Sequence, residues 1–205
     1  ETVLRHYYKI KDINGHIVEC GVWRGGFSIF LAHLFKYKNI WVSDSFEGFQ
    51  PINESTYNFE GERHTPKFTT TPLGPIGISL EEVKQHFSNY DLEDDDRINY
   101  LKGFVNQTLP FAPIKYISLL RIDVDSFSAT LEVLDHLYDK VTPGGYIIFD
   151  DTGLPESLEA IKSFFQRRNL PLILNHPITD EVLDINTRYI NNDSGIPEGC
   201  YIIKN

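Results

Sequence analysis

Acidic side chains recur where the predicted strands of this 205-residue chain end, and these are the side chains best suited to chemistry. Asp123 and Asp125 follow one apolar run, and Asp150 and Asp151 follow the next. If the two strands are neighbours in a parallel sheet, Asp123, Asp150 and Asp151 meet at one edge. Buried carboxylates in contact repel one another unless a proton or a cation neutralises them. An all-oxygen ligand set suits Mg²⁺, so the sequence predicts a magnesium site. In the alternative interpretation, Asp150 and Asp151 cap the helix that follows.

A second candidate site lies at the ends of the first two strands. Gly21, Gly25 and Gly26 allow the backbone to approach a ligand closely, although their spacing is neither the dinucleotide fingerprint nor the phosphate-binding loop. Taken alone, these glycines indicate a tight strand-to-helix turn equally well. Asp44 ends the second strand, where a carboxylate can accept hydrogen bonds from two ribose hydroxyls. A ribose site without a pyrophosphate cradle favours S-adenosylmethionine as the cofactor.

Alternating strands and helices must position these residues. Strands are expected at residues 16–22, 39–44, 98–101, 116–123, 145–150, 172–174 and 200–203, and helices at 27–35, from about 80, at 127–141 and at 156–168. The pattern predicts an α/β fold with a doubly wound, mostly parallel seven-stranded sheet flanked by helices, in a single domain over residues 1–205. Residues 50–78, rich in Pro and Gly, interrupt the pattern, and we expect a lid over the active site or a tolerated surface insertion.

Composition limits the partners of the chain. It carries 29 acidic against 19 basic residues, a formal net charge of −10, which disfavours nucleic acids and anionic membranes. No run approaches the roughly 20 apolar residues of a membrane span, and the first residues do not resemble a signal peptide. Cys20 and Cys200 are too few for a disulfide framework, so we expect a reducing, cytoplasmic compartment. Since the sequence contains no methionine, we expect a trimmed or partial chain.

Five sequence blocks, in order, resemble the macrocin O-methyltransferase (TylF-like) family. They are residues 19–26 (ECGVWRGG), 44–49 (DSFEGF), 108–110 (TLP), 121–125 (RIDVD) and 143–151 (PGGYIIFDD). The resemblance extends from about His16 to Asp151. It implies a class I methyltransferase fold that uses S-adenosylmethionine and Mg²⁺, and its better-known members methylate sugar hydroxyls of antibiotics. The expected acceptor is therefore a hydroxyl-bearing small molecule, a sugar or other polyol. Assembly into a homo-oligomer stays open.

The resemblance also assigns roles to individual residues. The cofactor-binding set is Glu19, Gly21, Trp23, Gly25, Ser28, Asp44, Ser45, Gly103, Phe104 and Asp123. Within it, Asp44 would hold the ribose, while Gly103 and Phe104 would lie along the adenine. The metal ligands would be Asp123, Asp150 and Asp151. Asp125 matches the position of the general base, which would take the proton from an acceptor hydroxyl whose pKa the metal lowers, and Asp123 would be the second catalytic residue.

The chain departs from the family pattern at three positions. Val124 and Phe127 replace a glycine and a tyrosine of the pattern Asp-Gly-Asp-Leu-Tyr. Catechol-type relatives carry a lysine base where this chain has Ser126, which favours Asp125 as the base.

Two other function classes stay open at this point. A Mg²⁺-dependent phosphotransfer enzyme or hydrolase can use the same aspartates, although it has no need of a ribose-binding acid. A cofactor-binding domain that has lost catalysis is the other alternative, and the intact aspartate set argues against it.

Overall fold

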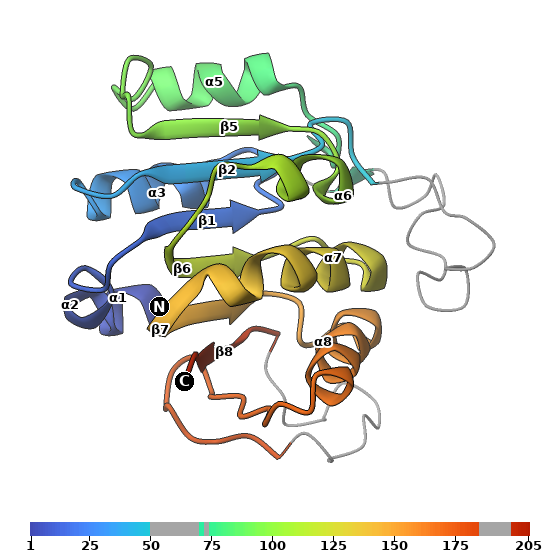
Figure 1. Ribbon diagram of the computed structural model, residues 1–205. Coiled ribbons are helices and arrows are strands. Elements are labelled where there is room, and N and C mark those ends of the chain that lie inside the picture. The colour runs from blue at the N-terminus through green and yellow to red at the C-terminus, as the bar shows by residue number, and fades with distance from the viewer. Residues whose placement is uncertain (50–69, 72–73, 185–197) are drawn as a thin grey trace.

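A mixed six-stranded sheet forms the centre of the part of the chain that the structure describes (Figure 1). The computed structural model describes residues 1–49, 70–71, 74–184 and 198–205. The strands are β1 (His16–Cys20), β2 (Ile40–Asp44), β5 (Ile98–Lys102), β6 (Ile117–Ile122), β7 (Val141–Phe149) and β8 (Cys200–Ile203). Their order is β5-β2-β1-β6-β7-β8, and all neighbours pair in parallel except β7 with β8.

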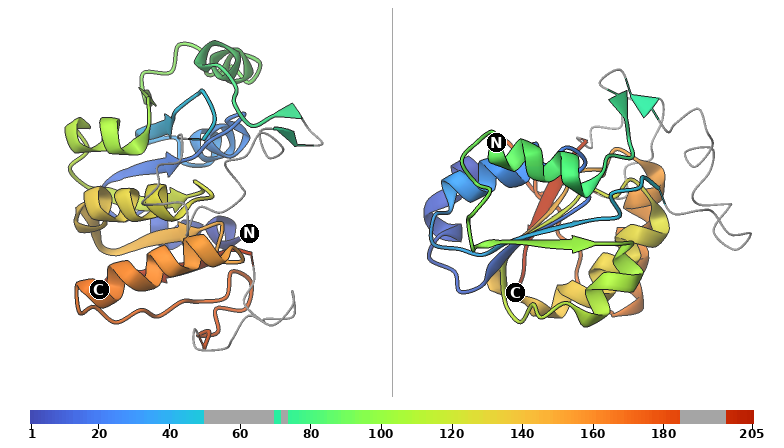
Figure 2. Two further views of the ribbon diagram at one scale, coloured as in Figure 1. Left: turned by 90° about the vertical axis from the view of Figure 1, so that its right-hand side faces the viewer. Right: turned by 90° about the horizontal axis from the view of Figure 1, so that it is seen from above.

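Helices cover both faces of the sheet (Figure 2). One face carries α6 (Val105–Thr108), α7 (Phe127–Leu137) and α8 (Pro155–Arg167). The other carries α1 (Thr2–Arg5), α2 (Tyr7–Ile10), α3 (Gly26–Leu34) and α5 (Leu80–Ser88). Each face has its own apolar core, because successive side chains of a strand point to opposite sides and both sides are covered. This accounts for the nearly continuous apolar runs of β1 and β6.

Most expected elements are present, with local differences at their ends. Ser79 and Glu82 form a capping box at the start of α5, as their spacing indicates. Short elements that the sequence pattern did not indicate are α1, α2, α6, a 3₁₀ turn (Leu109–Phe111) and a small hairpin of β3 (Thr70–Thr71) with β4 (Gly74–Pro75). The helix expected at 127–141 ends at Leu137 and continues as a 3₁₀ turn (Tyr138–Lys140). The expected lid lies mostly outside the described residues, at 50–69 and 72–73.

The expected seventh strand, at 172–174, is not a strand of the described sheet. On the outer side of β8, Asn175 forms an isolated antiparallel bridge with Tyr201 of that strand. The chain then reverses direction, and Asn175 forms a second isolated bridge with Val182. Of the three residues, Leu174 is fully buried whereas Ile173 is 48% exposed. A three-residue apolar run at the outer margin of a sheet therefore makes one anchoring contact rather than a ladder.

An N-terminal clasp ties α1 to the C-terminal part of the fold. The carboxylate of Asp180 accepts hydrogen bonds from Arg5 at 2.8 Å and from the hydroxyl of Tyr201 at 2.8 Å, and it lies 3.1 Å from His6 Nε2. The His6 ring also packs on Tyr146 and Tyr201.

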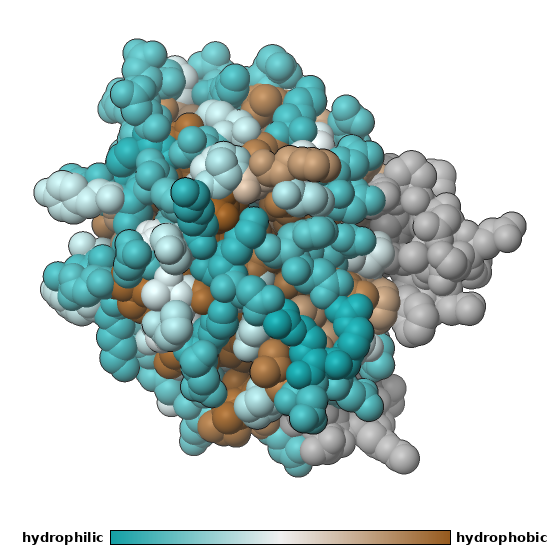
Figure 3. Space-filling model, in the orientation of Figure 1, coloured by the Kyte–Doolittle hydropathy of each residue, from teal (hydrophilic) through white to brown (hydrophobic). Residues whose placement is uncertain are grey.

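The face seen in Figure 3 is mainly hydrophilic, with apolar residues in scattered patches. Among the described helices, none combines the length and the apolar character that crossing a bilayer requires.

Gly21 allows the two central strands to approach each other just beyond their carboxyl ends. Its φ is +81°, and a Cβ added there would lie 1.7 Å from the carbonyl oxygen of Asp123. Glycine is therefore required at this position for two reasons: any side chain would collide with the Asp123 carbonyl, and the backbone conformation is left-handed. This close approach brings the segment after β1 against the segment after β6.

We expect Gly21→Ala to destabilise the protein by at least about 3 kcal/mol, because it adds overpacking to the cost of a left-handed alanine. Gly144 is the matched control: its φ is +82°, but an added Cβ would meet nothing within 4 Å. Gly144→Ala should therefore cost only the backbone part, roughly 1 to 2 kcal/mol. Urea denaturation measures both, and equal losses in the two variants would contradict the close-approach argument.

Candidate active site

The residues expected to bind a cofactor and a metal lie in a row along one edge of the sheet. From β5 to β7, the strand ends present Gly103, Asp44, Gly21, Asp123 and Asp150 in that order. Backbone hydrogen bonds of 2.9 to 3.0 Å tie each of these segments to a neighbouring strand. Strand order reverses between β1 and β6, which is where open α/β sheets bind their ligands.

The carboxylate of Asp44 organises the turns at its end of the row. Oδ2 accepts hydrogen bonds from the backbone of Val22 at 2.8 Å and of Trp23 at 3.2 Å, and Oδ1 accepts one from the backbone of Phe46 at 2.8 Å. Trp23 and Phe46 both have left-handed backbones, with φ of 45° and 57°. Asp44 therefore holds two strained turns in place, and its contact with a ribose stays a prediction.

Glu19 and Ser28, expected at the methionine end of the cofactor, are in contact. Glu19 is 1% exposed, and its Oε2 accepts a short hydrogen bond from the hydroxyl of Ser28. Its Oε1 lies 2.5 Å from Nη1 of Arg121. Burial raises the pKa of Glu19, while Arg121 and Ser28 oppose that rise. The carboxylate thus forms part of the framework behind the glycine turn.

Arg121 is a site residue to which sequence reasoning assigned no role. Its guanidinium lies 2.7 Å from Asp123 and 2.8 Å from Asp150 as well as contacting Glu19, and it stacks 4.6 Å from the centre of the Phe27 ring. The available signal was a single charged residue inside an otherwise apolar buried strand. Such a residue is rarely buried without a partner, so this signal predicts an ion pair for Arg121.

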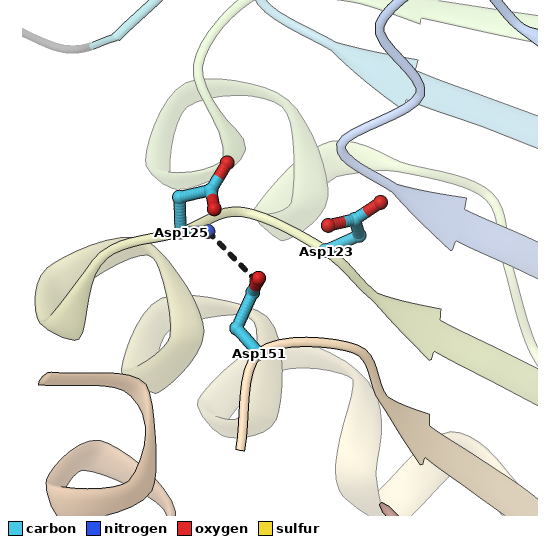
Figure 4. A group of neighbouring side chains, drawn as sticks. All are labelled: Asp123, Asp125 and Asp151. Atoms are coloured by element: carbon cyan, nitrogen blue, oxygen red, sulfur yellow. Dashed lines mark hydrogen bonds between the residues drawn. The ribbon is translucent and has the colours of Figure 1, made fainter. Parts of the chain in front are cut away.

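Asp123, Asp125 and Asp151 form an acidic cluster, with ligand oxygens within 4.8 Å of one another (Figure 4). The backbone N–H of Asp125 donates to Oδ2 of Asp151 at 3.1 Å, and Asp125 has a left-handed φ of 56°. The pKa of Asp123 is raised to about 7, mainly because the carboxyl group is desolvated. Neighbouring carboxylates add to this rise, and Arg121 opposes it. Desolvation and the charges of Asp125 and Asp123 raise the pKa of Asp151 to about 8.

Asp150, the third expected metal ligand, lies outside this cluster in the structure. Successive side chains along a strand point to opposite sides of the sheet. Asp150 therefore lies on the same side as Ile148, and Asp151 lies on the same side as Phe149. The carboxylate of Asp150 thus reaches Arg121 rather than Asp151. The structure brings together two of the three expected ligands, Asp123 and Asp151, with the expected base, Asp125.

The alternative capping role for Asp150 and Asp151 is wrong. The N-cap of α8 is Leu154, and no side-chain hydrogen bond caps that helix. Ser126 does cap a helix: its hydroxyl accepts a hydrogen bond from the backbone of Ala129 at 3.3 Å, at the start of α7. The residue at the position of the catechol-type lysine therefore has a structural task.

Three other residues expected near the cofactor, Gly25, Ser45 and Phe104, lie at the same edge, where they start helices or stabilise a turn. Gly25 is the N-cap of α3 in a left-handed conformation, and Phe104 is the N-cap of α6. The hydroxyl of Ser45 donates to the carbonyl of Gly48 at 2.6 Å. Cys20 is fully buried and burial raises the pKa of its thiol, which confirms a packing role rather than a nucleophilic one.

The mostly parallel sheet with this strand order and an antiparallel β8 has a class I methyltransferase fold, the fold of the O-methyltransferase structure to which the chain is similar. The family model described as macrocin O-methyltransferase (TylF) matches residues 4–182, and the chain belongs to that family.

Two curated relatives and one solved structure illustrate the similarity. Mycinamicin III 3''-O-methyltransferase of Micromonospora griseorubida is 35% identical over 178 residues, covering 84% of this chain and 66% of the relative. Demethyldecarbamoylnovobiocin O-methyltransferase of Streptomyces niveus is 39% identical over 145 residues, covering 68% of this chain and 53% of the relative. The structure of the O-methyltransferase NovP superposes with a TM-score of 0.76 at 27% identity, covering 98% of this chain and 80% of that one. The chain thus spans roughly half to two thirds of the length of these curated relatives.

We expect the free energy of unfolding of the metal-free protein to fall as the pH rises from about 5 to 8. In this range, folded Asp123 and Asp151 keep protons that the unfolded chain has released, because their pKa values are raised to about 7 and about 8. Urea titrations at several pH values measure the slope. Asp151→Asn removes one of the two groups while the histidines stay the same, so its slope should be shallower. Parallel slopes would contradict the raised pKa of Asp151.

Proposed function

We propose that this chain is the catalytic part of a Mg²⁺-dependent O-methyltransferase that uses S-adenosylmethionine. The acceptor is a hydroxyl group of a sugar or of another polyol or glycosylated small molecule. The observation that carries this proposal is the row of residues from Gly103 through Asp44 and Gly21 to the acidic cluster, which crosses the switch point of the sheet. Membership of the macrocin O-methyltransferase family, whose curated relatives are named as O-methyltransferases of mycinamicin III and demethyldecarbamoylnovobiocin, supports the same activity and argues against the phosphotransfer alternative.

The row has the chemistry that a cationic cofactor requires. Asp44 and Glu19 supply negative charge near Gly21, and the missing side chain of Gly21 lets the segments after β1 and β6 pack closely at the switch point. We assign the adenine end to Gly103 and Phe104, the ribose to Asp44 and Ser45, and the methionine end to the set Glu19, Gly21, Trp23, Gly25, Ser28 and Asp123. When bound, S-adenosylmethionine supplies the methyl group, and Mg²⁺ supplies positive charge that lowers the pKa of the acceptor hydroxyl.

The acidic residues fit a divalent cation. The pKa values of Asp123 and Asp151 are raised because both carboxylates are desolvated and lie close to other carboxylates, even though Arg121 partly compensates Asp123. A divalent cation would relieve this repulsion, and an all-oxygen set suits Mg²⁺. We propose Asp123, Asp150 and Asp151 as the ligands, with Asp123 also facing the cofactor. Asp150 must then leave Nη2 of Arg121, which is 2.8 Å away.

Asp125 is the proposed general base. Its left-handed backbone directs it to the acidic cluster, and its N–H anchors it to Asp151. A half-buried carboxylate in this position can accept the proton of an acceptor hydroxyl as the methyl group is transferred. Neighbouring Asp151 then fixes the position of the base without taking part in the transfer of the proton.

Titration calorimetry with S-adenosylhomocysteine, with and without MgCl₂, should show binding of the product cofactor by the isolated chain. Methyl transfer from labelled S-adenosylmethionine to a panel of glycosides and catechols then identifies the acceptor class. Activity should disappear when EDTA removes the metal and return when MgCl₂ is added. Failure to bind S-adenosylhomocysteine would contradict the proposed function, and turnover that EDTA leaves unchanged would contradict its dependence on Mg²⁺.

We expect Asp125→Asn to lower the rate of methyl transfer by about 10²- to 10⁴-fold, the usual contribution of a general base. Its affinity for S-adenosylhomocysteine should stay within about twofold of the wild-type value, because the amide keeps the shape of the side chain. Asp94→Asn, at an exposed position beyond α5, is the control for losing one negative charge and should leave the rate unchanged. A wild-type rate in Asp125→Asn would exclude this residue as the base.

A further inference from the structure

Arg121 joins the two halves of the candidate site through direct contacts. It stands on β6 opposite Glu19 of β1 in the parallel register, and its side chain is 11% exposed. Nη1 is shared between Glu19 Oε1 at 2.5 Å and Asp123 Oδ2 at 2.7 Å, while Nη2 contacts Asp150 Oδ2 at 2.8 Å. One guanidinium therefore bridges carboxylates from three neighbouring strands.

The carboxylates that share Arg121 have different proposed tasks. Glu19 belongs to the cofactor side of the site, and Asp123 and Asp150 belong to the metal side. The guanidinium keeps its charge at all physiological pH values, so its effect on the two sides is constant. Its planar shape and fixed donors suit a bridge of this kind better than the single ammonium of a lysine. The ring of Phe27, 4.6 Å from the guanidinium, limits where that bridge can move.

The two sides should respond to this cation in opposite ways. Glu19 is almost fully buried, so without its cationic partner the carboxylate must take up a proton or turn toward solvent, and either change removes the charged framework behind the glycine turn. On the metal side, Arg121 occupies oxygens of Asp123 and Asp150 and adds a positive charge beside the proposed position of a divalent cation. Like charges at such short range repel, which weakens the binding of a metal ion.

We propose that Arg121 is a positioning residue that acts as a counter-ion shared by both sides, strengthening the binding of cofactor while weakening the binding of Mg²⁺. This inference rests on the proposed function. It explains how Asp150 can be an ion-pair partner in one state and a metal ligand in another: Arg121 holds the carboxylate near the acidic cluster until a stronger cation competes for it.

The test compares Arg121→Gln with the wild-type protein by titration calorimetry, using MgCl₂ alone and S-adenosylhomocysteine alone. We expect the dissociation constant for Mg²⁺ to fall roughly three- to tenfold, because a neighbouring positive charge is gone. The dissociation constant for S-adenosylhomocysteine should rise at least about fivefold, because Glu19 has lost its partner. A general loss of structure would weaken both, so the opposite directions are the signature of a shared counter-ion.

Two further variants separate charge from shape. Arg121→Lys keeps the positive charge, so its affinity for Mg²⁺ should stay within about twofold of wild type, although one ammonium cannot span the three carboxylates. Arg167→Gln loses the same charge in an exposed ion pair with Asp135 and should change neither constant. If Arg121→Lys tightened Mg²⁺ binding as much as Arg121→Gln, the charge would not be the cause and the proposal would be overturned.

Should Arg121→Gln not fold, Glu19→Gln and the double variant Glu19→Gln/Arg121→Gln provide the same comparison on the metal side. With Glu19 neutral in both, the double variant should bind Mg²⁺ more tightly than the single one. Unchanged or weaker Mg²⁺ binding on loss of Arg121, in either background, overturns the proposal, as does unchanged cofactor affinity in Arg121→Gln. A wild-type protein that binds neither ligand overturns the proposed function together with this inference, whereas normal wild-type binding with unaffected variants overturns this inference alone.

Discussion

The contact of one guanidinium with three carboxylates is the interaction on which the functional edge of this sheet depends. Parallel strands end at the same edge, so Glu19 near the end of β1 is brought together with the aspartates that follow β6 and β7 whatever their charges. Arg121 compensates Glu19, Asp123 and Asp150 at the point where strand order reverses. Without such a cation, the two central strands would carry uncompensated buried charge side by side, and the close approach at Gly21 would add to their repulsion.

Three of the six non-glycine residues with positive φ in the described part of the chain lie along the same edge. Trp23, Phe46 and Asp125 are non-glycine residues with positive φ, and all three follow strands of the main sheet. Each such conformation costs on the order of 1 kcal/mol or more, so it persists only where surrounding contacts enforce it. Here Asp44 holds the first two through backbone hydrogen bonds, and Asp151 holds the third. The two apolar cores, one on each face of the sheet, hold in place the strands from which these turns extend.

The sequence predicted the parts of the fold and site that depend on local pattern, and it missed those that depend on side-chain partners. Apolar runs ending in aspartate correctly placed β2, β6 and β7, and the run before the glycine turn correctly placed β1, so the edge that carries Asp44 and Asp123 was predicted. The short helices α1 and α2 were not expected, because they are held by distant contacts such as that of His6 with Asp180 rather than by their own pattern. For the same reason, the run at 172–174 has strand-forming residues but lacks a partner along its length. The role of Arg121 likewise becomes visible only when its three partners are placed in space.

Asp150 and Asp151 show how a pair of adjacent acids can serve two functions. In sequence they look like one bidentate unit, yet strand alternation directs them to opposite faces, one toward Arg121 and one toward Asp125. Moving Asp150 to the acidic cluster breaks an ion pair that Arg121 would otherwise keep, so the binding of a cation there carries a cost that a simple triad of aspartates would not impose. That cost also acts on Asp123, which shares a donor with Glu19 on the cofactor side. Because Arg121 contacts Glu19 on one side of the switch point and Asp123 and Asp150 on the other, a charge change on either side alters the set of carboxylates that this one guanidinium compensates.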